Sequence, residues 1–181
     1  VSGLHFEDQL ASEKKCGHMG GKVIIPTHEY IKKLNSARLS SDVLGSPVVL
    51  IARTDALHAS LITSDFDDDD REFLSNKRTS DGYFSIKDNH GLAIKKALRY
   101  AEYADVIWCE TNTPDLGFAK EFADEIRKVF PDKILAYNCS PSFNWIGKFS
   151  ENEIKEFQKN LFELGYKLQF VSLAGFHSLA S

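Results

Sequence analysis

Short apolar runs alternate along this chain with longer segments in which apolar residues recur at helical spacing. The clearest run, Val48–Ala52, is rich in β-branched residues and shows no polar alternation, which is typical of a strand covered on both faces in a parallel sheet. Polar side chains follow each run at once, so parallel strands would gather them at one edge. The runs are residues 2–7, 48–52, 104–109, 134–137 and 168–171.

The segments between the runs predict helices at residues 27–43, 92–101, 114–129 and 150–164, with Thr27 and Ser150 as N-terminal caps of the first and last. The acidic stretch 65–74 is predicted to be a solvated surface loop. Its four consecutive acids repel one another and lack the defined geometry of metal ligands.

Alternating strands and helices with polar residues at the strand ends predict an α/β fold of the (β/α)8 TIM-barrel type. A doubly wound sheet would also alternate, but no Gly-x-Gly-x-x-Gly turn follows any run. A complete barrel takes about 250 residues, and the chain has 181. We therefore expect residues 1–181 to form a single partial catalytic barrel domain, an incomplete barrel with roughly the last five strands, the N-terminal strands lying upstream of Val1.

Composition narrows the class of protein. The chain is 43% hydrophobic and 27% charged with a net charge of -4, which is typical of a globular domain and weighs against a nucleic-acid partner. No apolar run approaches the ~20 residues of a membrane span. Three cysteines without a framework spacing predict reduced thiols in a reducing compartment such as the cytoplasm.

The stretch Lys14–Lys22 combines three lysines, a histidine, a cysteine and three glycines. Glycines give a backbone access to unusual conformations, and cations around a thiol favour the thiolate. We interpret the stretch as a mobile catalytic loop that closes over an anionic ligand, with Cys16 as its reactive group. The alternative is a solvated basic loop with an incidental thiol.

Five ordered motifs make the chain similar to the isocitrate lyase family: His5–Gln9, Lys14–His18, Ala52–Asp55, Trp108–Thr111 and Asn138–Trp145. The resemblance covers essentially the whole chain and the C-terminal part of the family's barrel. It implies a Mg²⁺-dependent homotetrameric enzyme of the glyoxylate bypass, linked to the tricarboxylic acid cycle, that cleaves isocitrate to succinate and glyoxylate. The implied location is the cytoplasm, or glyoxysomes and peroxisomes in a eukaryote.

The resemblance also implies roles for individual residues. Cys16 would be the general acid and base, a role worth ~10²–10⁴-fold in rate. Gly17 and His18 would bind substrate when the loop closes, with His18 also taking part in catalysis. Arg53 would bind substrate carboxylates through its planar fork. A structural salt bridge between Arg53 and Asp55 is the alternative, which we rank second at a strand end.

The string Asn138, Cys139, Ser140, Pro141 and Ser142 resembles the family's cradle for the succinate carboxylate. Proline stiffens the turn, so that hydroxyl and amide groups are held in place beforehand. Cys139 is expected to fill space as a small apolar group rather than to react. An ordinary Asn/Ser turn is the alternative.

Glu7 resembles the carboxylate near the family's magnesium, acting through a coordinated water, and Glu110 resembles an active-site carboxylate. Either residue would otherwise be a buried structural acid. Ser172 stands where the family commonly has threonine, which keeps the substrate-binding hydroxyl and removes a methyl group. The direct magnesium ligand and the serine-glycine-tryptophan loop for glyoxylate lie upstream in the family and are absent from this sequence.

Two alternatives to isocitrate cleavage stay open. The first is 2-methylisocitrate lyase, since one methyl group in a pocket is worth only ~1–3 kcal/mol. The second is a catalytically silent fragment, because an open partial barrel exposes strand edges and apolar surface.

Overall fold

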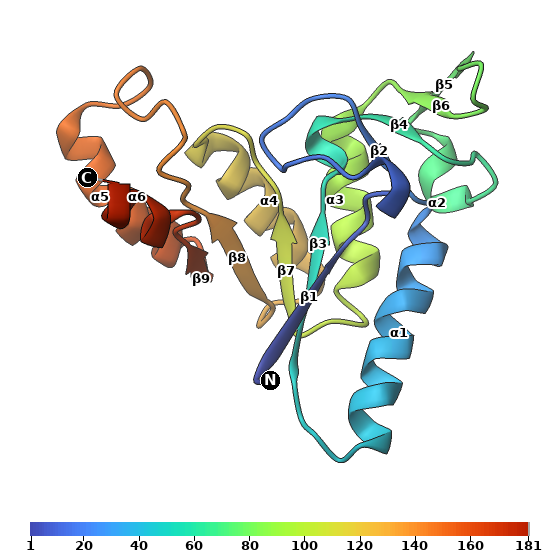
Figure 1. Cartoon of the computed structure of the whole chain (residues 1–181), viewed down its shortest axis with the longest axis horizontal. Helices are drawn as coiled ribbons and strands as arrows, with labels where there is room; N and C mark the ends of the chain where they lie inside the picture. Colours follow the sequence, from blue (N-terminus) through green and yellow to red (C-terminus); the bar gives the residue numbers. More distant parts are fainter. Residues whose placement is uncertain (181) are drawn as a thin grey trace.

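The computed structural model describes residues 1–180 and contains two sheets (Figure 1). The larger has five strands, all parallel, which lie side by side in the order of the chain. They are β1 (Gly3–Glu7), β3 (Val49–Thr54), β7 (Val106–Cys109), β8 (Ile134–Asn138) and β9 (Tyr166–Phe170). The predicted α/β class and parallel sheet are therefore confirmed, with small shifts in strand boundaries.

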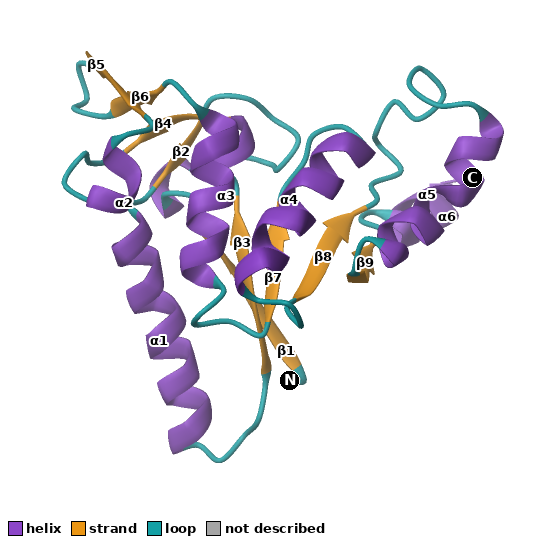
Figure 2. Ribbon diagram, turned by 180° about the vertical axis from the view of Figure 1, so that it is seen from behind, coloured by secondary structure: helices purple, strands orange, loops and turns teal. Residues whose placement is uncertain are grey.

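The helices that connect these strands cover one face of the sheet, as α1, α3 and α4 do in Figure 2. Asp88, Asp115 and Ser150 cap three of them by accepting a backbone N–H bond. Helix α1 has no side-chain cap, so the predicted role of Thr27 was wrong. No helix of residues 1–180 combines the length and apolar character needed to cross a membrane. The helices are α1 (Thr27–Val43), α2 (Asp68–Arg71), α3 (Asn89–Tyr100), α4 (Leu116–Val129), α5 (Glu151–Glu163) and α6 (Ala174–Ala180), with short 3-10 turns at Ala11–Glu13 and Ala56–His58.

Alternation along each strand divides the side chains between two faces of the larger sheet. One set, which includes Leu50, Ile107 and Leu135, packs with the helices in the main core. The next residues along the strands form a second cluster, whose buried members are Ile51, Val106, Trp108 and Ala136. This opposite face carries no helix of the α1, α3, α4 layer, and polar residues follow its apolar members toward the carboxyl ends of the strands.

The smaller sheet, which the sequence did not predict, has the order β2-β4-β6-β5 and lies beyond the carboxyl ends of the parallel strands (Figure 1). Its strands are β2 (Lys22–Ile24), β4 (Ala59–Ile62), β5 (Leu74–Arg78) and β6 (Phe84–Ile86). They have three to five residues, and even the apolar run Val23–Ile25 at β2 is too short for periodicity to identify a strand.

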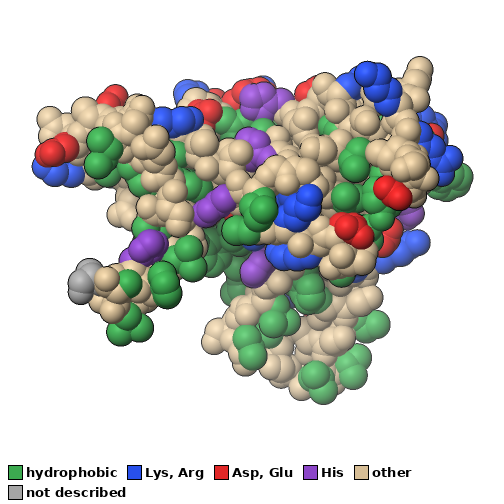
Figure 3. All heavy atoms as spheres, turned by 45° about the horizontal axis from the view of Figure 1, so that its top comes forward, with side chains coloured by type: hydrophobic (Ala, Val, Ile, Leu, Met, Phe, Trp, Pro, Cys, Tyr) green, Lys and Arg blue, Asp and Glu red, His purple; other side chains and the backbone are tan. Residues whose placement is uncertain are grey.

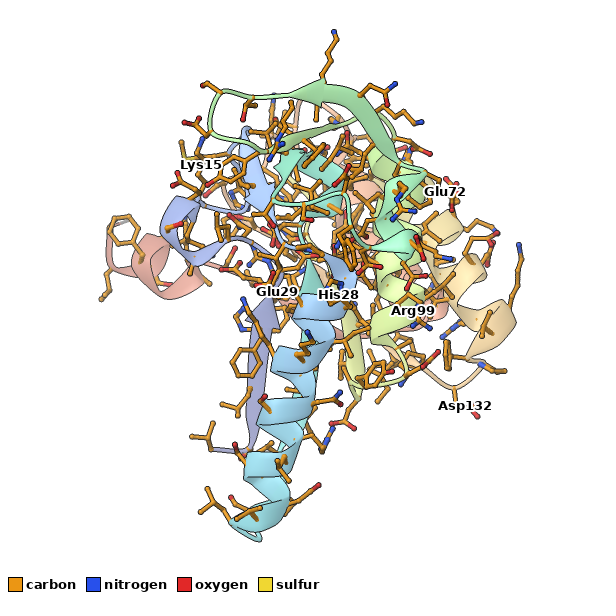
Figure 4. All side chains as sticks on the ribbon, turned by 90° about the vertical axis from the view of Figure 1, so that its right-hand side faces the viewer. Lys15, His28, Glu29, Glu72, Arg99 and Asp132 are labelled. Carbon is orange, nitrogen blue, oxygen red and sulfur yellow. The ribbon has the colours of Figure 1, made fainter. Side chains whose placement is uncertain are left out.

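The acidic stretch 65–74 is a structural element rather than a solvated loop, so that prediction was wrong. Asp70 is fully buried, and its carboxylate accepts bonds from the backbone N (2.8 Å) and Oγ1 (2.7 Å) of Thr27. Lys96 Nζ lies 3.3 Å from Asp70 Oδ1. His28 and Arg99, labelled in Figure 4, contact neighbouring acids from α1 and α3. The acids therefore join α1, α2 and α3, where cations and helix N–H groups offset their repulsion.

Candidate active site

The sheet register places three functional side chains in one row. Glu7 is paired with Arg53, and Arg53 with Trp108, on the adjacent strands β1, β3 and β7. Paired residues project from the same face, so these side chains meet. Arg53 Nη2 lies 3.2 Å from Glu7 Oε2, and the guanidinium carbon lies 4.8 Å from the centre of a Trp108 ring. His5 extends the aromatic part of the row, with its ring centre 5.4 Å from that of Trp108.

Arg53 forms a two-bond salt bridge with Asp55. From the sequence, this bridge ranked second, after a role of Arg53 in binding substrate carboxylates. Nε donates to Oδ2 at 2.9 Å and Nη2 donates to Oδ1 at 3.0 Å. Burial lowers the pKa of Arg53, but Asp55, Glu110 and Glu7 outweigh burial and raise it. The guanidinium therefore stays charged. Its Nη1 has no hydrogen-bond partner within residues 1–180 and is the donor left for a ligand.

A buried polar layer lies beneath Arg53. Asp8 accepts bonds from Thr54 Oγ1 (2.8 Å), the backbone N of Asp55 (2.8 Å) and Tyr100 Oη (3.0 Å). Burial raises the pKa of Asp8, whereas Arg53 and Lys22 overcome burial and lower the pKa of Asp55. Sequence reasoning assigned no role to Asp8, and it gave Asp55 only the alternative role of salt-bridge partner to Arg53. The available signal was their position directly after strands β1 and β3.

Glu110 follows β7 and is 4% exposed. Its Oε1 lies 3.8 Å from Arg53 Nη2 and 4.0 Å from His18 Nε2. Oε2 is buried and has no hydrogen-bond partner in the described chain. Burial raises the pKa of Glu110 to about 7, although Arg53 and Lys22 act to lower it. A carboxyl group with this pKa can exchange protons near neutral pH.

The basic stretch Lys14–Lys22, called the Cys16 loop below, rests on Arg53 and Glu110. A β-carbon added at Gly17 would overlap Oε1 of Glu110 and would lie 2.9 Å from Arg53 Nη2. The loop backbone therefore passes so close to both groups that a side chain at position 17 would require Glu110 to move. Cys16, one residue away, is exposed. Figure 3 shows histidine and basic side chains near the centre of the face at which the parallel strands end.

His18 and Lys22 both follow Gly17 in the loop, and each contacts a residue outside the loop. The His18 ring centre lies 4.8 Å from that of Phe143. Burial, followed by Lys22 and Arg53, lowers the pKa of His18, which favours the neutral imidazole. Lys22 is fully buried as the first residue of β2. The prediction of a mobile loop was therefore wrong for Lys22.

In the string after β8, Asn138 and Ser140 are held by hydrogen bonds to neighbouring residues. Asn138 uses its amide to bind Thr111, accepting from Oγ1 at 3.0 Å and donating to the backbone O at 2.9 Å. Ser140 is fully buried; its Oγ accepts from the backbone N of Ser142 at 3.2 Å, and its backbone O accepts from Trp145 Nε1 at 2.8 Å. Asn138 and Ser140 are thus fixed by neighbours at the carboxyl edge of the sheet.

The remaining predicted residues differ in exposure. Cys139 is buried, and burial raises the pKa of its thiol to about 11, in keeping with a space-filling role. Pro141 and Ser142 are exposed. Ser172 follows β9, and its Oγ is buried without a hydrogen-bond partner among the described residues. Within residues 1–180, no hydrogen bond or ion pair joins Cys16 or Ser172 to Arg53.

Glu7 is the carboxylate that the family resemblance assigns to a metal ion. Glu7 is half-buried at the end of β1, where its oxygens contact Lys14, Arg53 and Gln9. Among residues 1–180, no three His, Cys, Asp or Glu side chains are arranged to hold a metal. Mg²⁺ retains several waters and takes few direct protein ligands, so the donor set fits one indirect contact from Glu7.

Solved structures similar to this chain support the fold. Oxaloacetate acetylhydrolase in complex with 3,3-difluorooxalacetate matches with a TM-score of 0.66 and 22% identity, over 98% of this chain and 46% of that one. The 2,3-dimethylmalate lyase, a member of the PEP mutase/isocitrate lyase superfamily, matches with a TM-score of 0.60 and 19% identity, over 97% and 45%.

Other proteins are much more similar to this chain in sequence than these solved structures are. Isocitrate lyase of Corynebacterium efficiens is 58% identical over 179 residues, and that of Escherichia coli is 56% identical over the same length. Isocitrate lyase 1 of Mycobacterium tuberculosis is 53% identical. Each match covers 99% of this chain, which spans only 41–42% of these relatives. The sequence profile described as the isocitrate lyase family matches residues 1–77 and 74–181. The chain therefore belongs to the isocitrate lyase family.

Proposed function

We propose that this chain is part of an isocitrate lyase that cleaves isocitrate to succinate and glyoxylate. The observation that carries the proposal is the contact of Gly17 with Arg53 and Glu110. It brings the loop that carries Cys16 to a buried guanidinium and a carboxyl group with a pKa of about 7. Relatives named isocitrate lyase, 53–58% identical over almost the whole chain, support the same reaction.

The reaction needs two proton transfers. Isocitrate loses the proton of its hydroxyl group, and the bond from the hydroxyl-bearing carbon to its neighbour breaks. The hydroxyl oxygen becomes the aldehyde oxygen of glyoxylate, and the electron pair of the broken bond goes to the neighbouring carbon. That carbon then takes up a proton, which completes succinate. A base, an acid and donors for the negative charge are therefore required.

This chain offers a residue for each requirement. Cys16 donates the proton to carbon and, in the reverse direction, removes it as the thiolate. Glu110, whose pKa lies near neutrality, accepts the hydroxyl proton. Arg53 directs Nη1 to a substrate carboxylate, while Asp55 fixes the other edge of its fork. His18, as a neutral imidazole, donates a hydrogen bond to the substrate from the closed loop.

Other residues bind the substrate. Asn138, Ser140 and Ser142 face the succinate carboxylate, with Cys139 and Pro141 shaping the turn, and Ser172 supplies a further hydroxyl from the end of β9. The buried, unpartnered Oγ of Ser172 supports this role. The chain therefore binds succinate from β8 and β9 and carries out acid-base chemistry from β3, β7 and the Cys16 loop.

The longer protein would complete the site. We propose that residues 1–181 contribute five strands to an eight-stranded barrel, supported by the parallel sheet and by a match to only 42% of the relative from C. efficiens. Mg²⁺ would supply positive charge beside the substrate oxygens, with Glu7 holding one of its waters. A homotetramer in the cytoplasm completes the proposal, and the three free cysteines support a reducing compartment.

The test is a comparison of substrates. The full-length protein that carries this chain is assayed with Mg²⁺ and either isocitrate or 2-methylisocitrate. We expect kcat/KM to favour isocitrate by about tenfold or more, the value of one methyl group in a pocket. Preference for 2-methylisocitrate would overturn the substrate, and cleavage of neither would overturn the function.

The isolated chain is a separate case. Within residues 1–180, β1 and β9 are the two edges of the parallel sheet, each with a single paired neighbour. Such edges pair readily with other chains. We therefore propose that residues 1–181 alone are catalytically silent. Glyoxylate formation by the purified chain with Mg²⁺ and isocitrate would contradict this.

A further inference from the structure

The Asn138 side chain lies on the face of the parallel sheet that carries the functional row. Side chains alternate along a strand, and Ala136, two residues before Asn138, is paired with Trp108 on that face. Asn138 is the last residue of β8 and is 2% exposed. Its amide therefore projects toward the site from the carboxyl edge of the sheet.

Thr111, which directly follows Glu110, engages most of this amide. Asn138 Oδ1 accepts from Thr111 Oγ1 at 3.0 Å and from the backbone N of Thr111 at 3.3 Å. Asn138 Nδ2 donates to the backbone O of Thr111 at 2.9 Å. An asparagine amide has two acceptor sites on its oxygen and two N–H donors. Thr111 therefore occupies both acceptor sites and one donor, and a single Nδ2–H is left.

The same contacts fix the orientation of the amide. Turning it over would place Asn138 Nδ2 against the backbone N–H of Thr111 and Oδ1 against the backbone O, so that donor would meet donor and acceptor would meet acceptor. Within residues 1–180, Thr111 is the only hydrogen-bond partner of this amide. Buried donors are nearly always paired. The remaining N–H therefore has an acceptor still to find, and a ligand in the site can supply it.

We propose that Thr111 is a positioning residue that makes Asn138 a hydrogen-bond donor only, directed at a substrate carboxylate. With its oxygen fully engaged, Asn138 cannot accept a bond from a hydroxyl group, whereas its free N–H can donate to a carboxylate oxygen. Fixing this donor beforehand is the preorganisation that an anion site requires. The proposal rests on the proposed function, which supplies isocitrate and succinate as ligands.

The alternative is a purely structural role, in which Thr111 and Asn138 only tie together the ends of β7 and β8. Such a role would lower stability without changing the affinity for ligand. Thr111→Val removes the hydroxyl and keeps the shape of the side chain, and Thr111→Ser keeps the hydroxyl. Thr113 provides a matched control, since its Oγ1 accepts from Lys148 Nζ at 2.9 Å and makes no bond to Asn138.

Steady-state kinetics of the full-length protein with Mg²⁺ and isocitrate separate the two roles. Losing one of the bonds that orient the amide should raise KM about 3–10-fold in Thr111→Val, while kcat stays within about threefold. Thr111→Ser and Thr113→Val should each keep KM within about twofold of wild type. A normal KM in folded Thr111→Val, a loss confined to kcat, or an equal rise in Thr113→Val would overturn the proposal.

Succinate binding, measured by calorimetry without turnover, tests whether Thr111 acts through Asn138. Thr111→Val should weaken succinate binding about 3–10-fold in the wild-type background. In the Asn138→Ala background the same change should weaken it by less than about twofold, because no amide is left to orient. Equal weakening in the two backgrounds would show that Thr111 acts by another route and would also overturn the proposal.

Failure of this proposal and failure of the proposed function give different results. If the wild type neither cleaves isocitrate nor binds succinate, the proposed function fails and this proposal fails with it. If the wild type does both and Thr111→Val matches it, only the role of Thr111 fails. If Thr111→Val does not fold, Thr111→Ala removes the same hydroxyl without a branched side chain, and the same changes in KM and succinate binding are expected of it.

Discussion

Glu110 Oε1 lies only 3.8 Å from the guanidinium of Arg53, yet burial raises the pKa of Glu110 to about 7. An adjacent cation usually keeps a carboxyl group acidic. Here Arg53 is already engaged by both oxygens of Asp55, and the negative charges of Asp55 and Glu7 add to the effect of burial. The Arg53–Asp55 pair thus leaves Glu110 free to bind and release a proton near neutral pH.

The first prediction concerns pH. Because the pKa of Glu110 is raised from 4.5 to about 7 on folding, its protonated form is favoured in the native state. The wild type should lose stability as pH rises between these values, whereas Glu110→Gln should not. The stability that the wild type loses through Glu110 over this pH range is on the order of 3 kcal/mol at most. Thermal unfolding of both proteins at about pH 5 and about pH 8.5 measures it. A stability difference that does not change with pH would contradict the raised pKa.

The second prediction uses two glycines of the Cys16 loop. A β-carbon at Gly17 would overlap Glu110, whereas nothing lies within 4 Å of the same atom at Gly20. Gly17→Ala should therefore displace the loop and lower kcat/KM about 10²-fold, the typical cost of misplacing reacting groups by an ångström. Gly20→Ala should stay near wild type. Equal losses in the two variants would mean that loop flexibility, rather than contact with Glu110, governs activity.

The third prediction concerns the thiol. Cys16→Ser should keep substrate binding but lower kcat about 10²–10⁴-fold, because a hydroxyl is a much weaker acid than a thiol. Cys109→Ala is the control, since Cys109 is buried within β7 and has no proposed role in catalysis. It should lose some stability and keep its turnover. Steady-state kinetics and isocitrate binding by calorimetry separate the two effects, and normal turnover in Cys16→Ser would exclude Cys16 from the mechanism.

The fourth prediction compares two acids of the same run. The Asp70 side chain is fully buried beside Lys96, whereas that of Asp68 is 88% exposed. Asp70→Asn should destabilise the protein by about 3–5 kcal/mol, because it breaks a buried ion pair. Asp68→Asn should change the free energy of unfolding by less than about 0.5 kcal/mol. Denaturant unfolding measures both. Similar changes in the free energy of unfolding for the two variants would indicate that the acidic stretch is a solvated loop after all.

The fifth prediction concerns magnesium. Glu7→Gln should raise the Mg²⁺ concentration that gives half-maximal activity about 10–100-fold, as expected for a group that orients a metal-bound water. Glu13→Gln, at an exposed position near the same loop, should leave it unchanged. Activity is titrated with Mg²⁺ after treatment with a chelator. A normal Mg²⁺ requirement in Glu7→Gln would show that Glu7 has no part in metal binding and serves only in its contacts with Lys14 and Arg53.

The sequence was sufficient for the features that depend on local spacing. The runs at 48–52 and 104–109 predicted parallel strands, because a continuous apolar segment is stable only when both of its faces are covered. Ser150 was predicted to cap a helix, and the structure confirms this and adds Glu153 as its partner in a capping box. The ordered motifs identified the family for the same reason, since each is a short string whose residues are adjacent in the chain.

Tertiary structure decided what depends on distant partners. Lys22 and Asp55 are 33 residues apart, and Thr27 and Asp70 are 43 apart. From sequence alone, a lysine or an aspartate is expected to be exposed to solvent, because burying a charge is unfavourable. Burial becomes possible only when an opposite charge or a set of hydrogen bonds offsets the lost hydration. Arg53 and Asp55 are close in sequence, but Asp55 is held in place by hydrogen bonds with Asp8 and Lys22, which are distant in the chain. Only the folded chain brings those groups together.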